Sequence, residues 1–195
     1  MKGMAVVVCI LCTLGVICSA QIAQETEALL TGVAFIAQGL QLVTDKGCGE
    51  TYREGESISI SVTSPIDGYL YLLDFQADGK VVMMLFPCRS FWKDFPVTVK
   101  ANTKLTIPPE VATTKLTISP PFGKELLFAF VVPEERADLI KIFDANNADE
   151  HSYLTEQGSL AGQLAAVLIQ LRASGVNLVA GICTYYAAPA AANSP

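Results

Sequence analysis

The sequence contains a single histidine and no residue spacing that is typical of a catalytic or metal site. A Ser–His, Cys–His or zinc site would have to use that residue, His151. It lies in the polar run 144–152 without a second ligand nearby in the sequence, so a solvated loop histidine is the favoured interpretation. We therefore expect a protein that is not an enzyme and that binds no metal or other cofactor.

Basic residues are also few. Thirteen lysines and arginines stand against 19 aspartates and glutamates, which gives a formal net charge of −6. Proteins that bind nucleic acid need the opposite balance, because phosphate contacts are made by clustered lysine and arginine. We expect no nucleic acid among the partners.

Charged residues are missing altogether from residues 5–17. This apolar run follows Lys2 and precedes small residues, which is the pattern of a secretory signal peptide and its cleavage site. The run is shorter than the roughly 20 residues that a membrane-spanning helix needs. We predict that residues 1–20 are a signal peptide and that the exported chain begins at Gln21, in the periplasm or outside the cell, with no membrane span. An uncleaved anchor is the less favoured alternative, and lipidation at Cys18 is disfavoured because no small residue precedes it.

A series of strand patterns, divided by turns, makes up most of the remaining sequence. Ser57–Thr63 alternates polar and apolar residues, as a half-buried strand does. Tyr69–Phe75 and Lys80–Phe86 flank Asp78-Gly79, a strong hairpin signal for which we expect a type I′ turn. Further strands are expected at 39–44, 97–99, 104–107, 115–118, 126–132 and 177–186.

Strands at this spacing are typical of a sandwich. We predict a mainly β protein, an immunoglobulin-like antiparallel β-sandwich with one or two added helices. Its expected organisation is a signal peptide at 1–20, a lead-in segment at 21–38 that is helical in part, one β-sandwich domain at 39–186 and a disordered tail at 187–195.

A change of periodicity predicts one long helix. From Ser159 to Arg172 five apolar residues fall on one helical face, and Gly175 follows where a C-terminal cap is expected. Both faces of the hairpin at 69–86 are apolar, although one face of a sandwich strand normally meets water. Because the helix is the only segment that is long and apolar enough to cover the second face, we expect it to pack there. Its apolar stripe is Leu160, Leu164, Val167, Leu168 and Leu171.

Three cysteines remain beyond the signal peptide, Cys48, Cys88 and Cys183. One disulfide with a free thiol and three free cysteines are both open interpretations. In an antiparallel meander Cys48 and Cys88 lie at opposite ends of the sheet, separated by about 23 Å of strand. The limit between the Cα atoms of a disulfide is about 7 Å. These two cysteines should therefore not pair with each other, and any bridge must use Cys183.

Three weaker signals favour a structural role over a chemical one. Asp74 and Asp78 suggest a calcium loop, but the alternating oxygen ligands of such a loop are absent and a turn is favoured. Glu54 and Glu56 resemble a catalytic acid pair, yet they stand at the start of a strand, where a glutamate can accept backbone hydrogen bonds. Ser159 is better explained as a helix N-cap than as a nucleophile.

Aromatic residues provide the candidate binding surface. Phe91, Trp92 and Phe95 lie beside an arginine and a lysine, and aromatics next to cations can form a sugar or peptide platform. The favoured alternative is that they fold back and close one end of the sandwich. Tyr69 and Tyr71 of the hairpin complete the candidate surface.

The run 52–87, YREGESISISVTSPIDGYLYLLDFQADGKVVMMLFP, resembles the bacterial family known as domain of unknown function 4384. The resemblance rests on a Tyr-x-x-Gly-Glu start, a D-G-Y-L-Y strand, a D-G-K-V turn and L-F-P, and it extends over about Leu40 to Val132. Family members tend to be exported, or fused to kinases and caspase-like peptidases, which implies an accessory β-sandwich. The family has no assigned catalytic residues, so none is carried over. Cys88 departs from the pattern, because an asparagine is usual after L-F-P.

From these observations we expect an exported, non-enzymatic protein-interaction module of the bacterial cell envelope. Its partner is expected to be another envelope protein, and the sequence leaves the oligomeric state open. Two alternatives are an envelope hydrolase centred on His151 and a structural subunit of an envelope assembly. A large exposed apolar patch would be the signature of the structural subunit.

Overall fold

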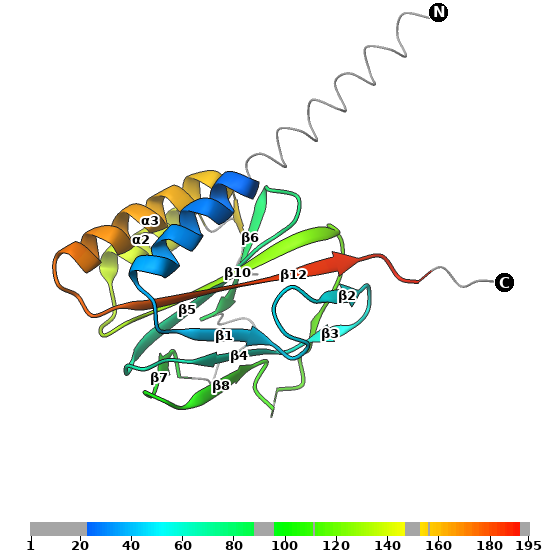
Figure 1. Ribbon diagram of the computed structural model, residues 1–195, viewed down its shortest axis with the longest axis horizontal. Coiled ribbons are helices and arrows are strands. Elements are labelled where there is room, and N and C mark those ends of the chain that lie inside the picture. The colour runs from blue at the N-terminus through cyan, green and yellow to red at the C-terminus, as the bar shows by residue number, and fades with distance from the viewer. Residues whose placement is uncertain (1–22, 88–95, 111, 147–152, 156, 192–195) are drawn as a thin grey trace, which may run out of the picture.

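The computed structural model is mainly β and is organised in layers (Figure 1). A seven-stranded sheet lies between a smaller β layer and a layer of helices. Within the described residues, no helix is long and apolar enough to span a membrane. The predicted signal peptide falls outside these residues, which are 23–87, 96–110, 112–146, 153–155 and 157–191.

The large sheet has the strand order β11-β6-β5-β10-β12-β2, with β7 paired to one end of β5. All its neighbouring strands are antiparallel except β12 and β2, which run parallel. Its strands are β2 (Thr51–Arg53), β5 (Gly68–Phe75), β6 (Val81–Phe86), β7 (Thr98–Val99), β10 (Gly123–Val132), β11 (Tyr153–Thr155) and β12 (Val179–Ala188).

The smaller β layer consists of two antiparallel parts. The first is a three-stranded sheet of order β1-β4-β8, and the second is the pair β3-β9. Their strands are β1 (Gln41–Thr44), β3 (Ser57–Ile58), β4 (Ile60–Thr63), β8 (Lys104–Ile107) and β9 (Leu116–Thr117). The prediction of an antiparallel mainly β sandwich is confirmed.

Each face of the large sheet has its own apolar core. Strands β5 and β10 are buried along nearly their whole length, because consecutive residues point to opposite faces and both faces are covered. Leu70, Leu72 and Leu127 point toward the smaller β layer, whereas Leu73 and Phe128 point toward the helices.

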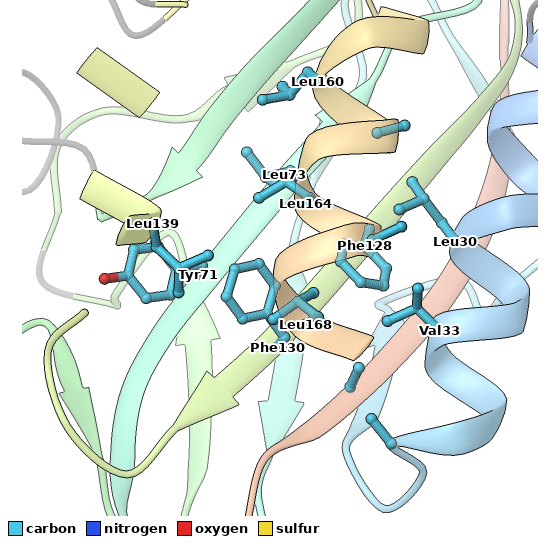
Figure 2. Close-up of a cluster of buried hydrophobic side chains, with 14 of the residues drawn as sticks. Leu30, Val33, Tyr71, Leu73, Phe128, Phe130, Leu139, Leu160, Leu164 and Leu168 are labelled. Carbon is cyan, nitrogen blue, oxygen red and sulfur yellow. The ribbon is translucent and has the colours of Figure 1, made fainter. Parts of the chain in front are cut away.

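The predicted helix does cover the second face of the hairpin. It is α3 (Gln157–Ala173), and Leu160, Leu164 and Leu168 pack in the same core as Leu73 (Figure 2). Leu171 is buried with them, and Val167 is partly buried against this core. Gly175 has φ of +83° after the last turn, as the predicted cap requires. The helix begins two residues earlier than expected, so Ser159 lies in its first turn and is not the N-cap.

The helix α3 is not the only cover, contrary to expectation. A helix over 23–36 buries Leu30 and Val33 in the same core, and α2 (Ala137–Asn146) buries Leu139 there (Figure 2). The part of the chain that the structure describes thus places three helices on this face of the sheet. The described part of the lead-in segment 21–38 belongs to the folded domain.

Two local expectations also need correction. Gly79 has φ of +69° but Asp78 does not have a positive φ, so the hairpin turn is not type I′. The loop is longer, and the Asp78 carboxylate closes it by accepting hydrogen bonds from the backbone N–H groups of Lys80 and Val81. At the other end of the chain, β12 continues to Ala188, two residues into the expected tail.

A disulfide joins Cys48, in the loop after β1, to Cys183 on β12. The Cα atoms are 5.3 Å apart and the two residues are 135 positions apart in the sequence. This confirms that a bridge must use Cys183, while Cys88 lies outside the described residues.

We predict that Leu164→Ala lowers the free energy of unfolding by about 2–5 kcal/mol, because it leaves a cavity in a fully buried part of the helical core. Urea denaturation followed by circular dichroism measures this change. The matched control is Ile169→Ala on the same helix, where the side chain is 45 % exposed, and its effect should stay within about 0.5 kcal/mol. Equal losses in the two variants would contradict the packing described here.

We also predict that peptide mapping without reduction links Cys48 to Cys183, and that reduction lowers the free energy of unfolding by about 2–5 kcal/mol. The cause is the long loop that the bridge closes in the unfolded chain. In the double variant Cys48→Ala/Cys183→Ala, the reductant should leave the melting temperature unchanged. A link between Cys48 and Cys88 would refute both the bridge and the strand order.

Candidate functional site in the inter-sheet pocket

Three polar side chains meet inside the sandwich, on the face of the large sheet that is turned toward the smaller β layer. Asp74 is on β5, Glu125 on β10 and Tyr185 on β12, which are consecutive strands of the sheet. Glu125 is directly opposite Tyr185, and Asp74 is opposite Leu127, two residues along β10 from Glu125. Because side chains alternate between faces, all three project to the same side as Leu127.

The tyrosine hydroxyl connects the two carboxyl groups. It lies 2.9 Å from Oδ2 of Asp74 and also hydrogen-bonds Oε2 of Glu125. A hydroxyl has one hydrogen to donate, so contact with two carboxyl oxygens requires a second hydrogen between them. One of the two carboxyl groups therefore carries a proton, and the three side chains share it as a network.

Burial explains why the proton is retained. Asp74, Glu125 and Tyr185 are each 5 % exposed or less. Desolvation raises the pKa of Asp74, and desolvation followed by the nearby Asp74 charge raises the pKa of Glu125. Desolvation and the two acids also raise the pKa of Tyr185, which stays a hydroxyl. Among the described residues neither acid forms a salt bridge.

The three side chains line a pocket of about 330 Å³ that opens between the large sheet and the β3-β9 pair. The Oδ1 atom of Asp74 is buried and has no hydrogen-bond partner among the described residues. The described residues also contain no group of three or more His, Cys, Asp and Glu side chains that could hold a metal ion. The remaining lining residues are Ile58, Ile60, Gln76, Met83, Leu85, Lys115, Leu116, Thr117, Ile118, Ser119 and Pro120.

The candidate surface predicted from the sequence is not assembled by the described residues. Phe91, Trp92 and Phe95 lie outside them, as does His151. Tyr69 is half-buried against the helical core.

Tyr71 is a core residue. It is 5 % exposed and stacks on Phe130 and Phe143, with ring centroids 4.9 and 5.3 Å away. It contributes to the packing between the sheet and α2, so it is not available as part of a binding surface.

The structural interpretation of the glutamates is confirmed for Glu56. Its carboxylate accepts hydrogen bonds from the Lys46 ammonium and the Arg53 backbone N–H, which lower its pKa. Glu56 therefore links two loops. The two acids that lie together in this chain are Asp74 and Glu125.

Sequence reasoning did not find that pair. The pattern around Asp74 suggested only a calcium ligand, and no motif pointed to Glu125 or Tyr185. One signal was available: Asp74 is the only charged residue of β5, and it falls on the same alternating face as Leu70 and Leu72. A lone acid on an apolar strand face is a buried ionisable group, and such groups concentrate at functional sites.

We predict that the melting temperature falls as the pH rises from about 5 to about 9. Unfolded carboxyl groups lose their protons near pH 4, whereas the folded acid pair, with its raised pKa values, still holds one. Stability contributed by a raised acid pKa is therefore present at low pH and is lost as the pH rises through the folded value. Each tenfold difference in proton affinity between the folded and unfolded chain is worth about 1.4 kcal/mol. Thermal melts of Asp74→Asn should show a flatter profile.

The control for this experiment is Asp67→Asn. The exposed Asp67 carboxylate accepts a hydrogen bond from the Ala101 backbone N–H and pairs with Lys100, and both lower its pKa. The change should therefore leave the profile between pH 5 and 9 as in the wild type. An unaltered slope in Asp74→Asn would show that the buried pair does not hold the proton.

The model of the family described as Domain of unknown function (DUF4384) matches residues 51–135 of the chain. No curated protein and no solved structure matches the chain. The matched region includes Asp74 and Glu125 and ends before Tyr185. This match supports the resemblance to the same family that the sequence predicted.

Proposed function

We propose that this chain is an exported, non-enzymatic module of the bacterial cell envelope that binds another protein through the inter-sheet pocket. The observation that carries the proposal is the pocket itself, which has a buried acid pair at one end and exposed residues at its opening. Asp74 and Glu125 are desolvated, while Lys115, Thr117 and Ser119 of the lining are exposed. The pocket can therefore be reached from solvent.

Its size supports recognition of a single group. Small-molecule sites usually occupy about 300–1,000 Å³, and the volume of about 330 Å³ is at the low end of that range. A side chain of a partner fits such a space, whereas a strand or helix does not. Export is supported by the predicted signal peptide and by the disulfide between Cys48 and Cys183, since disulfides persist in oxidising compartments.

A structural subunit of an envelope assembly is the second candidate, and one observation favours it. The helix over 23–36 exposes Leu29, Phe35 and Ile36, with 78 % of Phe35 accessible to solvent. Exposed apolar side chains that lie near one another are typical of contact surfaces. This surface is on the helical layer, across the large sheet from the pocket (Figure 1).

Photo-crosslinking in cells that make the protein tests the two candidates against each other. We expect a photoreactive amino acid at position 115, on the rim of the pocket, to capture a partner protein, and one at position 35, on the helical layer, to capture none. Asp74→Asn combined with the probe at 115 should reduce the capture, because the acid pair is then incomplete. Capture at 35 alone would replace the proposal by the structural subunit, and no capture at 115 would refute it.

A further inference from the structure

The inter-sheet pocket combines a negative end with aliphatic walls. Asp74 and Glu125 form its buried end, and Tyr185 holds both carboxyl groups in place. The walls are made by side chains from both β layers, which are Ile58, Ile60, Met83, Leu85, Leu116 and Ile118. A ligand that fits must therefore present positive charge at its tip and an apolar stem behind it.

We propose that this pocket receives one alkyl cation, an ammonium or guanidinium group on a short methylene chain, with the cation between Asp74 and Glu125. The inference rests on the proposed function and names the group that the partner inserts, a lysine or arginine side chain. A free diamine has the same chemistry, so the source of the cation is decided by experiment.

The hydrogen bonds of the acid pair point to a donor-rich cation. Two carboxyl groups offer four oxygen atoms, and Tyr185 contacts one oxygen of each. The Oδ1 atom of Asp74 has no partner among the described residues although it is buried. A buried acceptor without a donor is costly, and a buried carboxylate without a counter-ion is costlier still. An ammonium supplies three N–H donors and a guanidinium five, together with the missing charge.

The walls select an organic cation over a metal ion. Lysine and arginine bury their methylene stems along apolar surface while the charged head meets a polar partner. A calcium ion takes six to eight oxygen ligands, whereas this end of the pocket offers two carboxyl groups and one hydroxyl. Magnesium retains several waters, and the aliphatic side chains beside the acids cannot hydrogen-bond them.

The charged and polar neighbours of the acid pair are few. Asp78, in the β5-β6 loop, adds negative charge that acts on Glu125. The carboxamide of Gln76 also lines the pocket, and Lys115 lines it from the β9 side, with an exposed side chain. Lys115 is thus the one positive charge among the lining residues, and it forms no salt bridge with Asp74 or Glu125.

Binding of the cation must be coupled to release of the shared proton. One of the two carboxyl groups in the network carries a proton, and a cation that enters takes the place of this proton. Over the pH range in which the free site holds this proton, the apparent affinity for the cation therefore increases about tenfold for each unit by which the pH rises. This sets the pocket apart from an exposed acidic patch, whose carboxylates are already ionised at neutral pH.

An NMR titration of the purified protein tests the inference. The probes are agmatine, N-acetyl-lysinamide and its uncharged isostere N-acetyl-norleucinamide, each at pH 6 and pH 8, with calcium chloride as a separate arm. We expect both cations to shift resonances of Tyr185 and Ile118, with affinity at least tenfold higher at pH 8, and no effect of the isostere. Tighter binding of agmatine would indicate a free amine as the source, and tighter binding of the lysine derivative a protein.

The variants keep the test falsifiable. Asp74→Asn preserves the shape of the pocket and should lose at least tenfold in affinity, whereas the exposed Asp67→Asn should bind as the wild type does. Lys115→Met should bind the cations more tightly, because it removes a positive charge from the lining that repels them.

Three results would overturn the inference: no cation binding in either the wild type or Lys115→Met, equal binding of the isostere, or binding of calcium at Tyr185. Cation binding without capture of a partner at position 115 would support the ligand class and refute the protein partner. Capture at position 115 without cation binding would support the protein partner and refute the alkyl cation as the group that enters the pocket.

Discussion

The central sheet is apolar on both faces, and this constraint governs the rest of the molecule. In β5 and β10 nearly every side chain is buried, so neither face can be left in water. One face is covered by the smaller β layer and the other by three helices (Figure 1). The sandwich with added helices is thus a consequence of two strands that lack a polar face. It also means that a polar side chain along the covered length of these strands lies in the interior, and Asp74 and Glu125 are such side chains.

An acid pair in an apolar interior needs a reason, because hydrophobic residues of similar size are often at least as stabilising. One reason is specificity, since the hydrogen bonds that join Tyr185 to the two acids favour a single register of β5, β10 and β12. Register alone does not require a pocket, however, and a structural pair would be fully hydrogen-bonded. The unpartnered Oδ1 atom of Asp74 and the open space beside it are better explained by a ligand.

Local periodicity was sufficient to predict the hairpin, the long helix and their contact, because an apolar face without cover requires a partner with a matching face. The helix over 23–36 was expected only in part, although Leu30, Val33 and Ala37 recur at helical spacing, since its alanine-rich sequence is only mildly apolar. The site could not be predicted. Tyr185 is 60 residues from Glu125 and 111 from Asp74, and their meeting depends on a strand order and register that periodicity does not encode.

The disulfide and the pocket are linked through β12. Cys183 and Tyr185 are two residues apart on the same strand face, so the bridge to Cys48 anchors the strand beside the site. Tyr52 packs edge-to-face on Tyr185, with ring centroids 5.8 Å apart, and its hydroxyl donates to Asp45 in the loop that carries Cys48. The tyrosine that holds the acid pair is therefore fixed from two sides by a segment that the disulfide secures. A site that is already ordered loses less entropy when a ligand binds. The disulfide between Cys48 and Cys183 should therefore strengthen ligand binding by holding Tyr185 and the acid pair in place.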